Sequence, residues 1–494
     1  MKVLLGHSYF LRFDPKLWRA MQPYPPLGTL YAASMLRERG HEVHLFDAML
    51  AESTDDWQRL LTEIRPDVAV LFEDNFNYLS KMCLLSMRQA AFRMVEAACR
   101  DGYTVVVAGA DVTDNAADYL QRGADYALLH EGEETLCELL DVLFDDSQPS
   151  VAGIAYLDED GTFTKTAARQ PMRDLDSLPP PARDLVPLGR YREAWRRQSR
   201  FSMNLVTARG CPYHCNWCAK PIWGQRYAVR SPAEVVEEIR QLARSGAHHL
   251  WFMDDIFGLK PGWVPAFAAR LESEGLKLPF KCLSRADLLL RPGEVDALRR
   301  AGCETVWIGA ESGSQSVLDA MEKGTTVEQI RQATRLLQDA GIEVAFFLQF
   351  GYPGETWADI QNTLRLVRDC RPDDIGMSVS YPLPGTPFFE RVKDQLKGNR
   401  NWVDSEDMAM LYDGPYPTSF YHHLHSSLHA EFRLRKAWRR GLRSSPRQLL
   451  GAVRDAVTLP LLQGRLLFDL IRHRRKANTL PVALSREQAS TPSQ

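Results

Sequence analysis

No stretch of the sequence is apolar for long enough to cross a lipid bilayer. A membrane-spanning helix needs about 20 consecutive apolar residues, but the longest candidate, at 457–471, is interrupted by Pro460, Arg465 and Asp469. The amino-terminal MKVLLGHSYFLRF turns polar too early for a signal peptide. We therefore expect a cytoplasmic protein, in which disulfides are rare and clustered cysteines indicate metal binding or catalysis.

Cysteine is scarce, and a fourth cysteine is missing where three stand close together. Cys211, Cys215 and Cys218 form a C-x-x-x-C-x-x-C run within RGCPYHCNWCAKPIWG. A structural zinc site closes with four protein ligands, and His214 lies inside the loop rather than at ligand spacing beyond it. Three thiolates suit a cubane [4Fe–4S] cluster whose fourth iron is open, with zinc as the main alternative. The other six cysteines are isolated, mostly in apolar surroundings, and are expected to be small buried hydrophobes: Cys83, Cys99, Cys137, Cys282, Cys303 and Cys370.

The first part of the chain has the pattern of a doubly wound α/β domain. A chain of 494 residues that is 45% hydrophobic is expected to form two or three domains with large cores. Residues 1–145 alternate short β-rich runs, such as KVLLGH and DVAVLFED, with helical segments, which predicts a parallel sheet. Ligands bind beyond the carboxyl ends of the strands in such a sheet. The residues at those ends are His7, Asp47, 73–75 and Gly109.

A repeated β/α unit follows a proline-rich linker. The linker is predicted over residues 146–195, because SLPPPARDLVPLGRY suits neither regular structure. In residues 196–395, helical segments end at a glycine, run into a buried strand and finish with polar groups, which is typical of a β/α barrel. The three glycines are Gly246, Gly302 and Gly341.

The cysteine run and the segments after it resemble the radical S-adenosylmethionine enzymes. Trp217 precedes the last cysteine of the run, and FMDDIF, SRADLL, GCETVWIGAESGSQSVLDAMEKGTT, FGYPGET and YPLPGTPF follow in the family's order over residues 200–390. YPPLGTLYAASMLRERGHEVHLFDA and GADYALLHEGEETL resemble the cobalamin-binding domain fused to one branch of that superfamily. That branch contains anaerobic magnesium-protoporphyrin ester cyclases and many C-methyltransferases.

The resemblance implies a fold and a set of cofactors. It implies an α/β protein with a Rossmann-like cobalamin-binding domain, a radical SAM partial (β/α)6 barrel and a C-terminal helical region at 396–494 that ends in a disordered tail. The cysteines would hold the cluster, whose open iron binds S-adenosylmethionine. One electron from an external reductant, such as flavodoxin or ferredoxin, would then give a 5′-deoxyadenosyl radical.

The resemblance also implies contacts to S-adenosylmethionine from the ends of the barrel strands. Glu311 matches the position that contacts the ribose, and Arg285 would meet the carboxylate as a charge-assisted pair. The alternative for an acid at a strand end is a cap or a surface charge. The implied residues are Trp217, Asp254, Asp255, Arg285, Glu311, Gln349 and Gly351.

Cobalamin is expected without a histidine ligand to cobalt. The usual lower-ligand motif, D-x-H-x-x-G, is absent, because none of the 12 histidines has Asp two positions before it. His7 is the only histidine near the end of the first strand, whereas EDNFN at 73–77 is expected to lie under the corrin. A flavodoxin-like domain that binds nothing is the alternative. The candidate cobalamin contacts are His7, Asn75, Phe76, Gly109, Ala110, Glu131, Gly132 and Glu133.

The C-terminal region is basic. Between Arg433 and Lys476 there are 13 Arg or Lys residues against two Asp. Such an excess can mark an anionic partner, either a membrane surface or nucleic acid, but we prefer a helical lid on the barrel with a solvated basic face and do not expect nucleic acid. The candidate residues for a substrate cavity wall are Tyr412, Tyr416, His422 and His425.

The function expected from the resemblance is methyl transfer to an unreactive carbon of a small-molecule or natural-product substrate. An oxidative or cyclising reaction of the magnesium-protoporphyrin cyclase type is the alternative within the branch. An RNA methylthiolation enzyme would need a second cluster, and no loop gathers Cys83, Cys99 and Cys137 for one. A non-catalytic cofactor-binding sensor is the remaining alternative.

Overall fold

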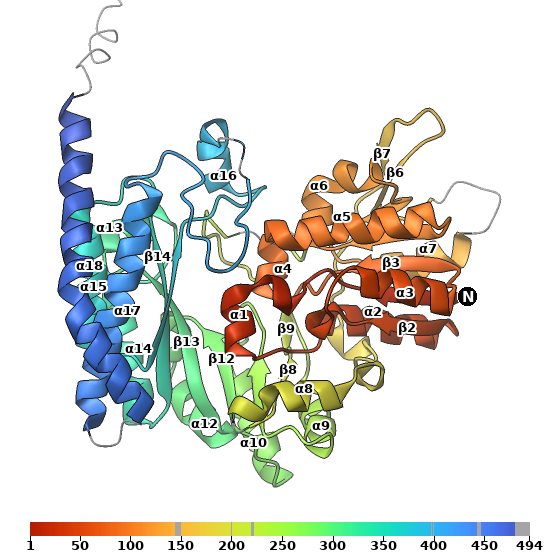
Figure 1. The fold of residues 1–494 in the computed structure, drawn as a ribbon. Coiled ribbons are helices and arrows are strands. Elements are labelled where there is room, and N and C mark those ends of the chain that lie inside the picture. Colours follow the sequence, from red (N-terminus) through yellow and green to blue (C-terminus); the bar gives the residue numbers. More distant parts are fainter. Residues whose placement is uncertain are drawn as a thin grey trace, which may run out of the picture.

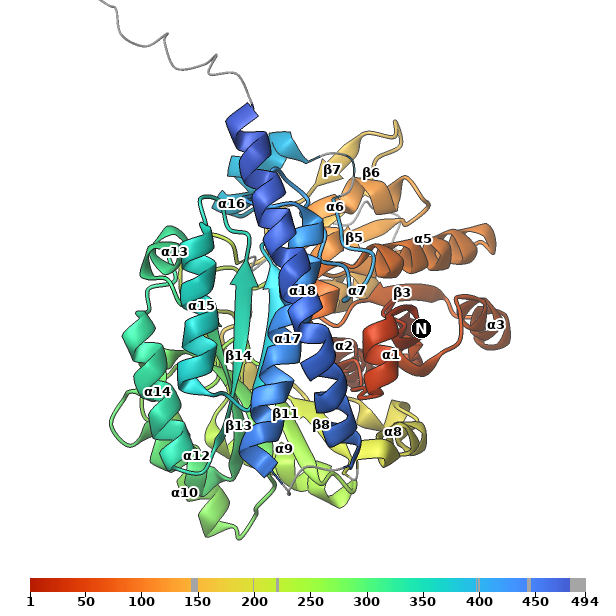
Figure 2. The same ribbon diagram turned by 60° about the vertical axis from the view of Figure 1, so that its left-hand side comes forward.

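The chain forms two α/β units that lie side by side, with two long helices over the outer side of the second unit (Figure 1, Figure 2). The computed structural model describes residues 1–143, 150–198, 200–218, 222–396, 398, 400–441 and 446–479. The predicted fold class is confirmed, because a doubly wound sheet is followed by a curled parallel sheet and a helical extension. No helix within these ranges has the length and apolarity needed to cross a bilayer.

The first unit is built on a seven-stranded sheet. Its strands are β1 (Lys2–Gly6), β2 (Glu42–Phe46), β3 (Val68–Phe72), β4 (Thr104–Ala108), β5 (Tyr126–Leu128), β6 (Ile154–Leu157) and β7 (Phe163–Lys165). The order is β2-β1-β3-β4-β5-β6-β7, and β1–β5 are parallel. The antiparallel hairpin β6–β7 extends this sheet, although it comes from the segment predicted as linker.

Helices cover both faces of the first sheet, which explains why β3 is apolar and buried along its whole length. One face packs on α3 (Asp55–Ile64), α5 (Leu85–Arg100) and α6 (Ala110–Leu120). The other face packs on α2 (Leu27–Glu38) and α7 (Glu133–Val142). The short helices of this part of the chain are α1 (Pro15–Ala20), α4 (Tyr78–Met82) and α8 (Leu188–Trp195).

The second unit is a partial barrel of six parallel strands in the order β15-β14-β13-β12-β11-β8. Its strands are β8 (Ser202–Leu205), β11 (His249–Phe252), β12 (Phe280–Ser284), β13 (Cys303–Glu311), β14 (Glu343–Phe350) and β15 (Asp374–Val379). A two-stranded ribbon of β9 (Ala208–Arg209) and β10 (Ala228–Val229) flanks the loop that carries the three cysteines. The helices are α9 (Pro232–Arg244), α10 (Trp263–Ser273), α11 (Ala286–Leu289), α12 (Glu294–Ala301), α13 (Gln315–Ala320), α14 (Val327–Asp339), α15 (Trp357–Cys370) and α16 (Pro387–Val392).

The glycines that mark the barrel repeat end their helices as predicted. Gly246, Gly302 and Gly341 have φ angles of +82°, +91° and +76°. A left-handed residue after a helix lets the chain turn into the next strand, and glycine adopts this conformation without steric cost.

The C-terminal helices pack on the barrel. In α17 (Thr418–Arg440), Phe420, Tyr421 and Leu424 are buried in the barrel core, and α17 contacts β15. The last helix, α18 (Pro446–Thr479), packs along α17 (Figure 2). The predicted disordered tail at 484–494 lies outside the described residues.

A buried ion-pair network joins the two units. Arg209, next to the cysteine loop, donates to Glu131 and, over 2.9 Å, to Glu133 of the first unit. The Arg209 side chain is 2% exposed and the carboxylates are 7% and 5% exposed. Burial opposes the charge of Arg209, but Glu133 and Glu131 outweigh it and raise the pKa of the guanidinium.

We predict that Arg209→Ala lowers the free energy of unfolding by about 3 kcal/mol, because it leaves two buried carboxylates unpaired. The loss should shrink as the pH falls from about 8 to about 5, because burial raises the pKa of Glu133 and protonation removes its unpaired charge. Thermal denaturation across this pH range is the measurement. Arg299→Ala, which removes an exposed pair with Asp296, is the matched control and should change stability little. An Arg209→Ala protein as stable as the wild type at every pH would contradict the prediction.

Candidate active site

The three cysteines stand in a loop that is fixed at its centre by Asn216. The Asn216 amide groups bond to the carbonyls of Met321 and Ala320 at 3.1 and 2.9 Å, and its side-chain oxygen accepts from the Tyr352 hydroxyl at 2.8 Å. The Asn216 carbonyl accepts from Phe388 N–H at 3.0 Å. Asparagine therefore holds the loop over the carboxyl ends of the barrel strands.

The thiols suit a cluster better than a single metal ion. Cys211 is buried against Ile256 and Leu288, beyond the ends of β11 and β12, whereas Cys215 and Cys218 are half-buried. Within the described ranges, no three His, Cys, Asp or Glu side chains converge as a zinc site requires. A cubane binds each thiolate at a separate iron, so it accepts sulfurs that stand apart.

Asp254 and Asp255 follow β11 and have different environments. Asp254 is buried and accepts from the backbone N–H and the hydroxyl of Thr207 at 2.8 and 2.7 Å. Burial raises the Asp254 pKa to about 7, against the effect of these bonds. Asp255 instead pairs with Lys81 of the first unit at 2.5 Å. The Asp254 side chain thus bonds to the segment after β8, whereas the Asp255 side chain pairs with the first unit.

Glu311 ends β13 in a strained conformation. Its φ is +56°, which is uncommon for a residue with a side chain, and its carboxylate pairs with Lys323 at 2.8 Å. A Cβ on Gly309 would lie 2.7 Å from both the Glu311 carboxylate and the Lys323 ammonium, so only glycine leaves room for this pair. Burial lowers the pKa of Lys323, but Glu311 and then Cys215 outweigh it and raise the pKa. Lys323 was not among the predicted site residues, although it lies within the EKGTT end of the family motif.

Arg285 is anchored within the barrel. Its guanidinium stacks 3.6 Å from the ring centroid of Tyr213, donates to Asp287 at 2.9 Å and donates to the Lys323 carbonyl at 3.0 Å. These contacts hold Arg285 beside the cysteine loop.

Gln349 and Gly351 end β14. The Gln349 amide donates to the Ser380 hydroxyl at 3.2 Å. Gly351 has a φ of +81° and its N–H donates to Glu355 at 2.6 Å, where burial raises the Glu355 pKa to about 8.

The barrel mouth has buried polar atoms that suit a polar ligand. In the part of the chain that the structure describes, the atoms of this kind without a hydrogen-bond partner include Trp217 Nε1, Asp254 Oδ2, Thr325 Oγ1 and Gln349 Oε1. Buried polar atoms normally find partners. The donors and acceptors present therefore fit the amine, carboxylate, hydroxyl and adenine groups of S-adenosylmethionine.

The carboxyl edge of the first sheet has a similar set of unpartnered atoms. Among the described residues these are His7 Nδ1, Ser8 Oγ, Asn75 Oδ1 and Ser80 Oγ. His7 Nε2 lies 3.2 Å from Asp47 Oδ1 and 3.1 Å from the Ala48 nitrogen, so this nitrogen is engaged within the domain. The edge suits the many amide groups of a corrin, and the predicted absence of histidine ligation stays a prediction.

Two glycines let the backbone at this edge pack closely against neighbouring side chains. A Cβ on Gly109, whose φ is +145°, would lie 2.7 Å from the Glu73 side chain, and one on Gly132 would lie 3.1 Å from Phe72. Ala110 is buried against Phe76. The predicted tail contacts Glu131 and Glu133 are bound to Arg209, as described above, and Glu131 also accepts from Met172 N–H at 2.5 Å.

The two edges meet at a short segment of the first unit. Phe76 stacks on Trp223 of the second unit with centroids 5.0 Å apart, and Lys81 lies 5.0 Å from the same indole. Between these anchors, Tyr78 is 57% exposed. Although its side chain is this exposed, desolvation by the surrounding protein and then the charges of Cys218 and Glu311 raise the pKa of the phenol. Tyr78 was missed from sequence because nothing in EDNFNY indicates that this segment meets the second unit.

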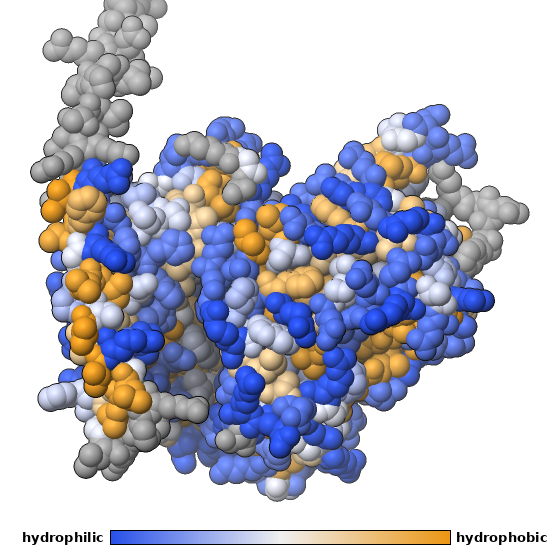
Figure 3. Space-filling model, viewed as in Figure 1, coloured by the Kyte–Doolittle hydropathy of each residue, from blue (hydrophilic) through white to orange (hydrophobic). Residues whose placement is uncertain are grey.

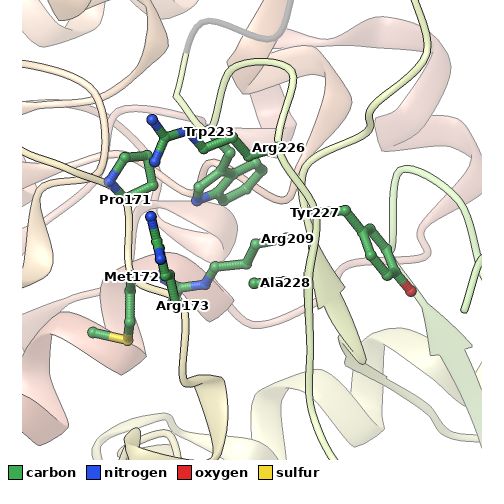
Figure 4. Close-up of a pocket in the computed structure, with 8 residues that line it drawn as sticks. All are labelled: Pro171, Met172, Arg173, Arg209, Trp223, Arg226, Tyr227 and Ala228. Atoms are coloured by element: carbon green, nitrogen blue, oxygen red, sulfur yellow. The ribbon is translucent and has the colours of Figure 1, made fainter.

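A cavity of about 410 Å³ adjoins this junction. Figure 4 shows Arg173 and Arg209 near Trp223 and Pro171, with Tyr227 farther away. Because Arg209 both lines the cavity and bonds to Glu131, the cavity lies beside the turn predicted to contact the cobalamin tail.

The predicted cavity-wall residues have different surroundings. The hydroxyl of buried Tyr412 donates to the Gly351 carbonyl, which ties it to the S-adenosylmethionine end of β14. Tyr416 stacks on a phenylalanine of α17 with centroids 4.3 Å apart. His422 is exposed, and His425 is half-buried, where burial lowers its pKa to about 4.

Comparison with known proteins identifies both units. The family model described as the radical SAM superfamily matches residues 205–367, and the B12 binding domain model matches residues 19–140. An uncharacterized methyltransferase of Pyrococcus horikoshii is 27% identical over 76% of this chain and 81% of that protein. The anaerobic magnesium-protoporphyrin IX monomethyl ester cyclase of Cereibacter sphaeroides is 28% identical over 76% of this chain but only 61% of that protein.

The fold matches a solved methyltransferase. The radical S-adenosylmethionine methyltransferase TsrM from Kitasatospora setae, solved with cobalamin and a [4Fe–4S] cluster, superposes with a TM-score of 0.66 at 21% identity. The match covers 81% of this chain and 76% of TsrM. The chain therefore contains a radical SAM domain and a B12-binding domain, its relatives include methyltransferases and anaerobic magnesium-protoporphyrin cyclases, and its cofactors are a [4Fe–4S] cluster, S-adenosylmethionine and cobalamin.

Proposed function

We propose that this enzyme transfers a methyl group to an unreactive carbon of a small-molecule substrate. The observation that carries the proposal is the meeting of the two carboxyl edges across Phe76–Trp223 and Lys81–Asp255. When bound, the cluster with S-adenosylmethionine supplies a 5′-deoxyadenosyl radical, and the cobalamin supplies the methyl group. A carbon held between the two edges is within reach of both, as positioning within a few ångströms requires.

The chain's own residues bind and orient the reactants. We assign Cys211, Cys215 and Cys218 to the cluster. The Glu311–Lys323 pair would present a carboxylate to the ribose while neutralising its charge in the buried site. The second oxygen of Asp254, which has no partner among the described residues, would accept from the amine of S-adenosylmethionine.

The domain junction would keep water from the reacting groups. Phe76 and Trp223 pack with Tyr31, Val206 and Ile222 in one buried cluster at the junction. A reactive carbon radical needs such exclusion, because a dry site prevents side reactions.

Methylthiolation and cyclisation are the two alternative reactions, and they need different sites. Methylthiolation would need a second cluster, but Cys83 lies at the carboxyl edge of the first sheet, Cys99 at the end of α5 that leads into β4, and Cys137 on the buried side of α7. Cyclisation shares the whole site described above. The chain spans 81% of the matched methyltransferase and 61% of the matched cyclase.

The enzyme would work in the cytoplasm with an external one-electron donor. We propose a flavodoxin or a ferredoxin, because the described chain offers three clustered cysteines and no second cluster of them.

The proposal is tested by anaerobic turnover of the reconstituted enzyme with S-adenosylmethionine carrying a deuterated methyl group and a fractionated metabolite extract. We expect S-adenosylhomocysteine and 5′-deoxyadenosine in equal amounts, together with a product that carries the deuterated methyl group. Release of 5′-deoxyadenosine with an oxidised, unmethylated product would overturn methyl transfer in favour of cyclisation. Release of neither nucleoside would favour a sensor.

Tyr78→Phe should weaken the use of S-adenosylmethionine. Because Tyr78 stands between Phe76 and Lys81, which both contact the second unit, its hydroxyl is positioned to bond to the bound reactants, and one such bond is worth roughly three- to tenfold. We expect the KM for S-adenosylmethionine in 5′-deoxyadenosine release to rise by about that factor, with iron and cobalamin contents unchanged. Tyr103→Phe, which removes a bond to the Leu61 carbonyl on the far side of the first unit, should change nothing. A KM equal to that of the wild type would remove Tyr78 from the site.

The triple variant Cys211→Ala, Cys215→Ala, Cys218→Ala should lose its iron, its brown colour and its 5′-deoxyadenosine release, because it has no ligands for the cluster. Cys99→Ala changes the exposed cysteine outside the loop and should keep all three properties. Iron analysis after anaerobic reconstitution is the measurement. A triple variant that kept about four irons per chain would refute the assignment.

A further inference from the structure

The outer face of α18 carries an apolar stripe that packs against nothing in the described structure. The stripe consists of six side chains whose exposed fractions range from 46% to 71%: Leu450, Val453, Val457, Leu461, Phe468 and Ile471. Their spacing of three, four or seven residues places them on one side of a helix, over a length of about 30 Å. Figure 3 shows apolar side chains along this helix, at the left edge of the molecule.

The opposite side of α18 makes the packing contacts. Leu466 and Leu470 are buried in the barrel core. Asp455 is buried and accepts from Arg433 of α17 at 2.6 and 2.9 Å, and Asp469 pairs with His423 of α17 at 2.8 Å. The helix is therefore fixed in rotation, and the apolar stripe faces outward.

Cations border the stripe on one side. Arg454, Arg465 and Arg472 are exposed and recur at spacings of 11 and seven residues, which brings them to one edge of the stripe. The two acidic residues of the described part of α18 are the buried Asp455 and Asp469, so its described outer face is cationic. Near the end of α17, Trp438 is 89% exposed.

We propose that this face of α18 binds the surface of an anionic membrane, with the helix lying in the plane of the interface. The stripe would enter the boundary between headgroups and acyl chains while the arginines pair with anionic headgroups, as in other interfacial amphipathic helices. A crossing orientation is not available to this helix, because Pro460 and Arg465 interrupt the apolar run.

Charge favours a lipid surface over a second copy of the chain. Two copies paired through the stripe would bring rows of arginines together, and the described outer face offers no acid to neutralise them. An anionic bilayer supplies both an apolar layer and negative charge. The inference does not depend on the reaction that the enzyme catalyses.

The test is co-sedimentation of the full-length holoenzyme with vesicles of phosphatidylcholine alone or mixed with phosphatidylglycerol. The wild type should bind the mixed vesicles, bind the neutral ones weakly and lose binding at high salt. Val457→Asp with Leu461→Asp should reduce binding at least roughly tenfold, since it puts charge into the stripe. Both positions are exposed, so the melting temperature should stay near that of the wild type.

Matched changes separate the stripe from general effects of charge. Leu336→Asp with Val403→Asp replaces two exposed apolar residues elsewhere and should leave binding unchanged. Arg454→Gln, Arg465→Gln and Arg472→Gln together should reduce binding to mixed vesicles and its salt dependence. The proposal is overturned if the wild type stays in solution with both kinds of vesicle. It is also overturned if light scattering shows a dimer that the stripe variant dissociates, or if the wild type binds RNA oligonucleotides in place of vesicles.

Discussion

A guanidinium buried between two carboxylates of another domain is the constraint on which the arrangement of this enzyme depends. Arg209 stands two residues before Cys211, and Glu131 and Glu133 stand at the turn into α7, so one network fixes both the cysteine loop and the edge of the first sheet. Gly210, between Arg209 and Cys211, has a φ of +81°. A Cβ there would lie 2.2 Å from the Arg226 carbonyl, so this position requires glycine. The desolvation cost of burying these charges is large, and a pair that only stabilised the fold would be replaced at little loss by apolar residues. The Arg209 network supplies directional bonds that hold the start of the cysteine loop against the edge of the first sheet. Apolar packing would not supply such bonds.

The polar groups at the two edges are of two kinds: those with hydrogen-bond partners in the protein and those without. The groups that position the site are satisfied within the protein, as with Asn216 in the loop and Asp254 Oδ1 on Thr207. The groups that face the reactants are left without protein partners at both edges, and the backbone at Glu311 adopts a strained conformation. Natural proteins accept such local violations at functional sites and compensate for them elsewhere. The large buried core that spans the barrel supplies this compensation.

Local patterns in the sequence predicted the fold well, because the two sheets are built from repeated local units. Apolar runs such as VAVLF and the glycines that end helices depend only on neighbours in the chain. The hairpin β6–β7 was missed because its strands are only four and three residues long and prolines follow them, although Gly161 marks its turn. Family motifs indicated the cysteine loop and Glu311, but not that Lys323 neutralises Glu311 or that Arg209 spans 76 residues to Glu133. Such partners are set by the tertiary fold, and neither periodicity nor composition carries that information.

The partial closure of the barrel explains why α17 is present, but it does not explain the outer side of α18. Six parallel strands leave β15 at an edge, and α17 covers it with Phe420, Tyr421 and Leu424. A second helix that only shielded α17 would need apolar residues on its inner side alone, as amphipathic helices of soluble proteins have. In α18 the inner side includes two buried aspartates in ion pairs, while leucine, valine and phenylalanine side chains face outward. The apolar side chains on the outer side have no explanation in the packing of the barrel, since the stripe could be polar without loss of any described contact. Large exposed apolar surface in a soluble protein normally marks an interaction site, and the outward face of α18 is therefore set by what the enzyme contacts rather than by how it folds.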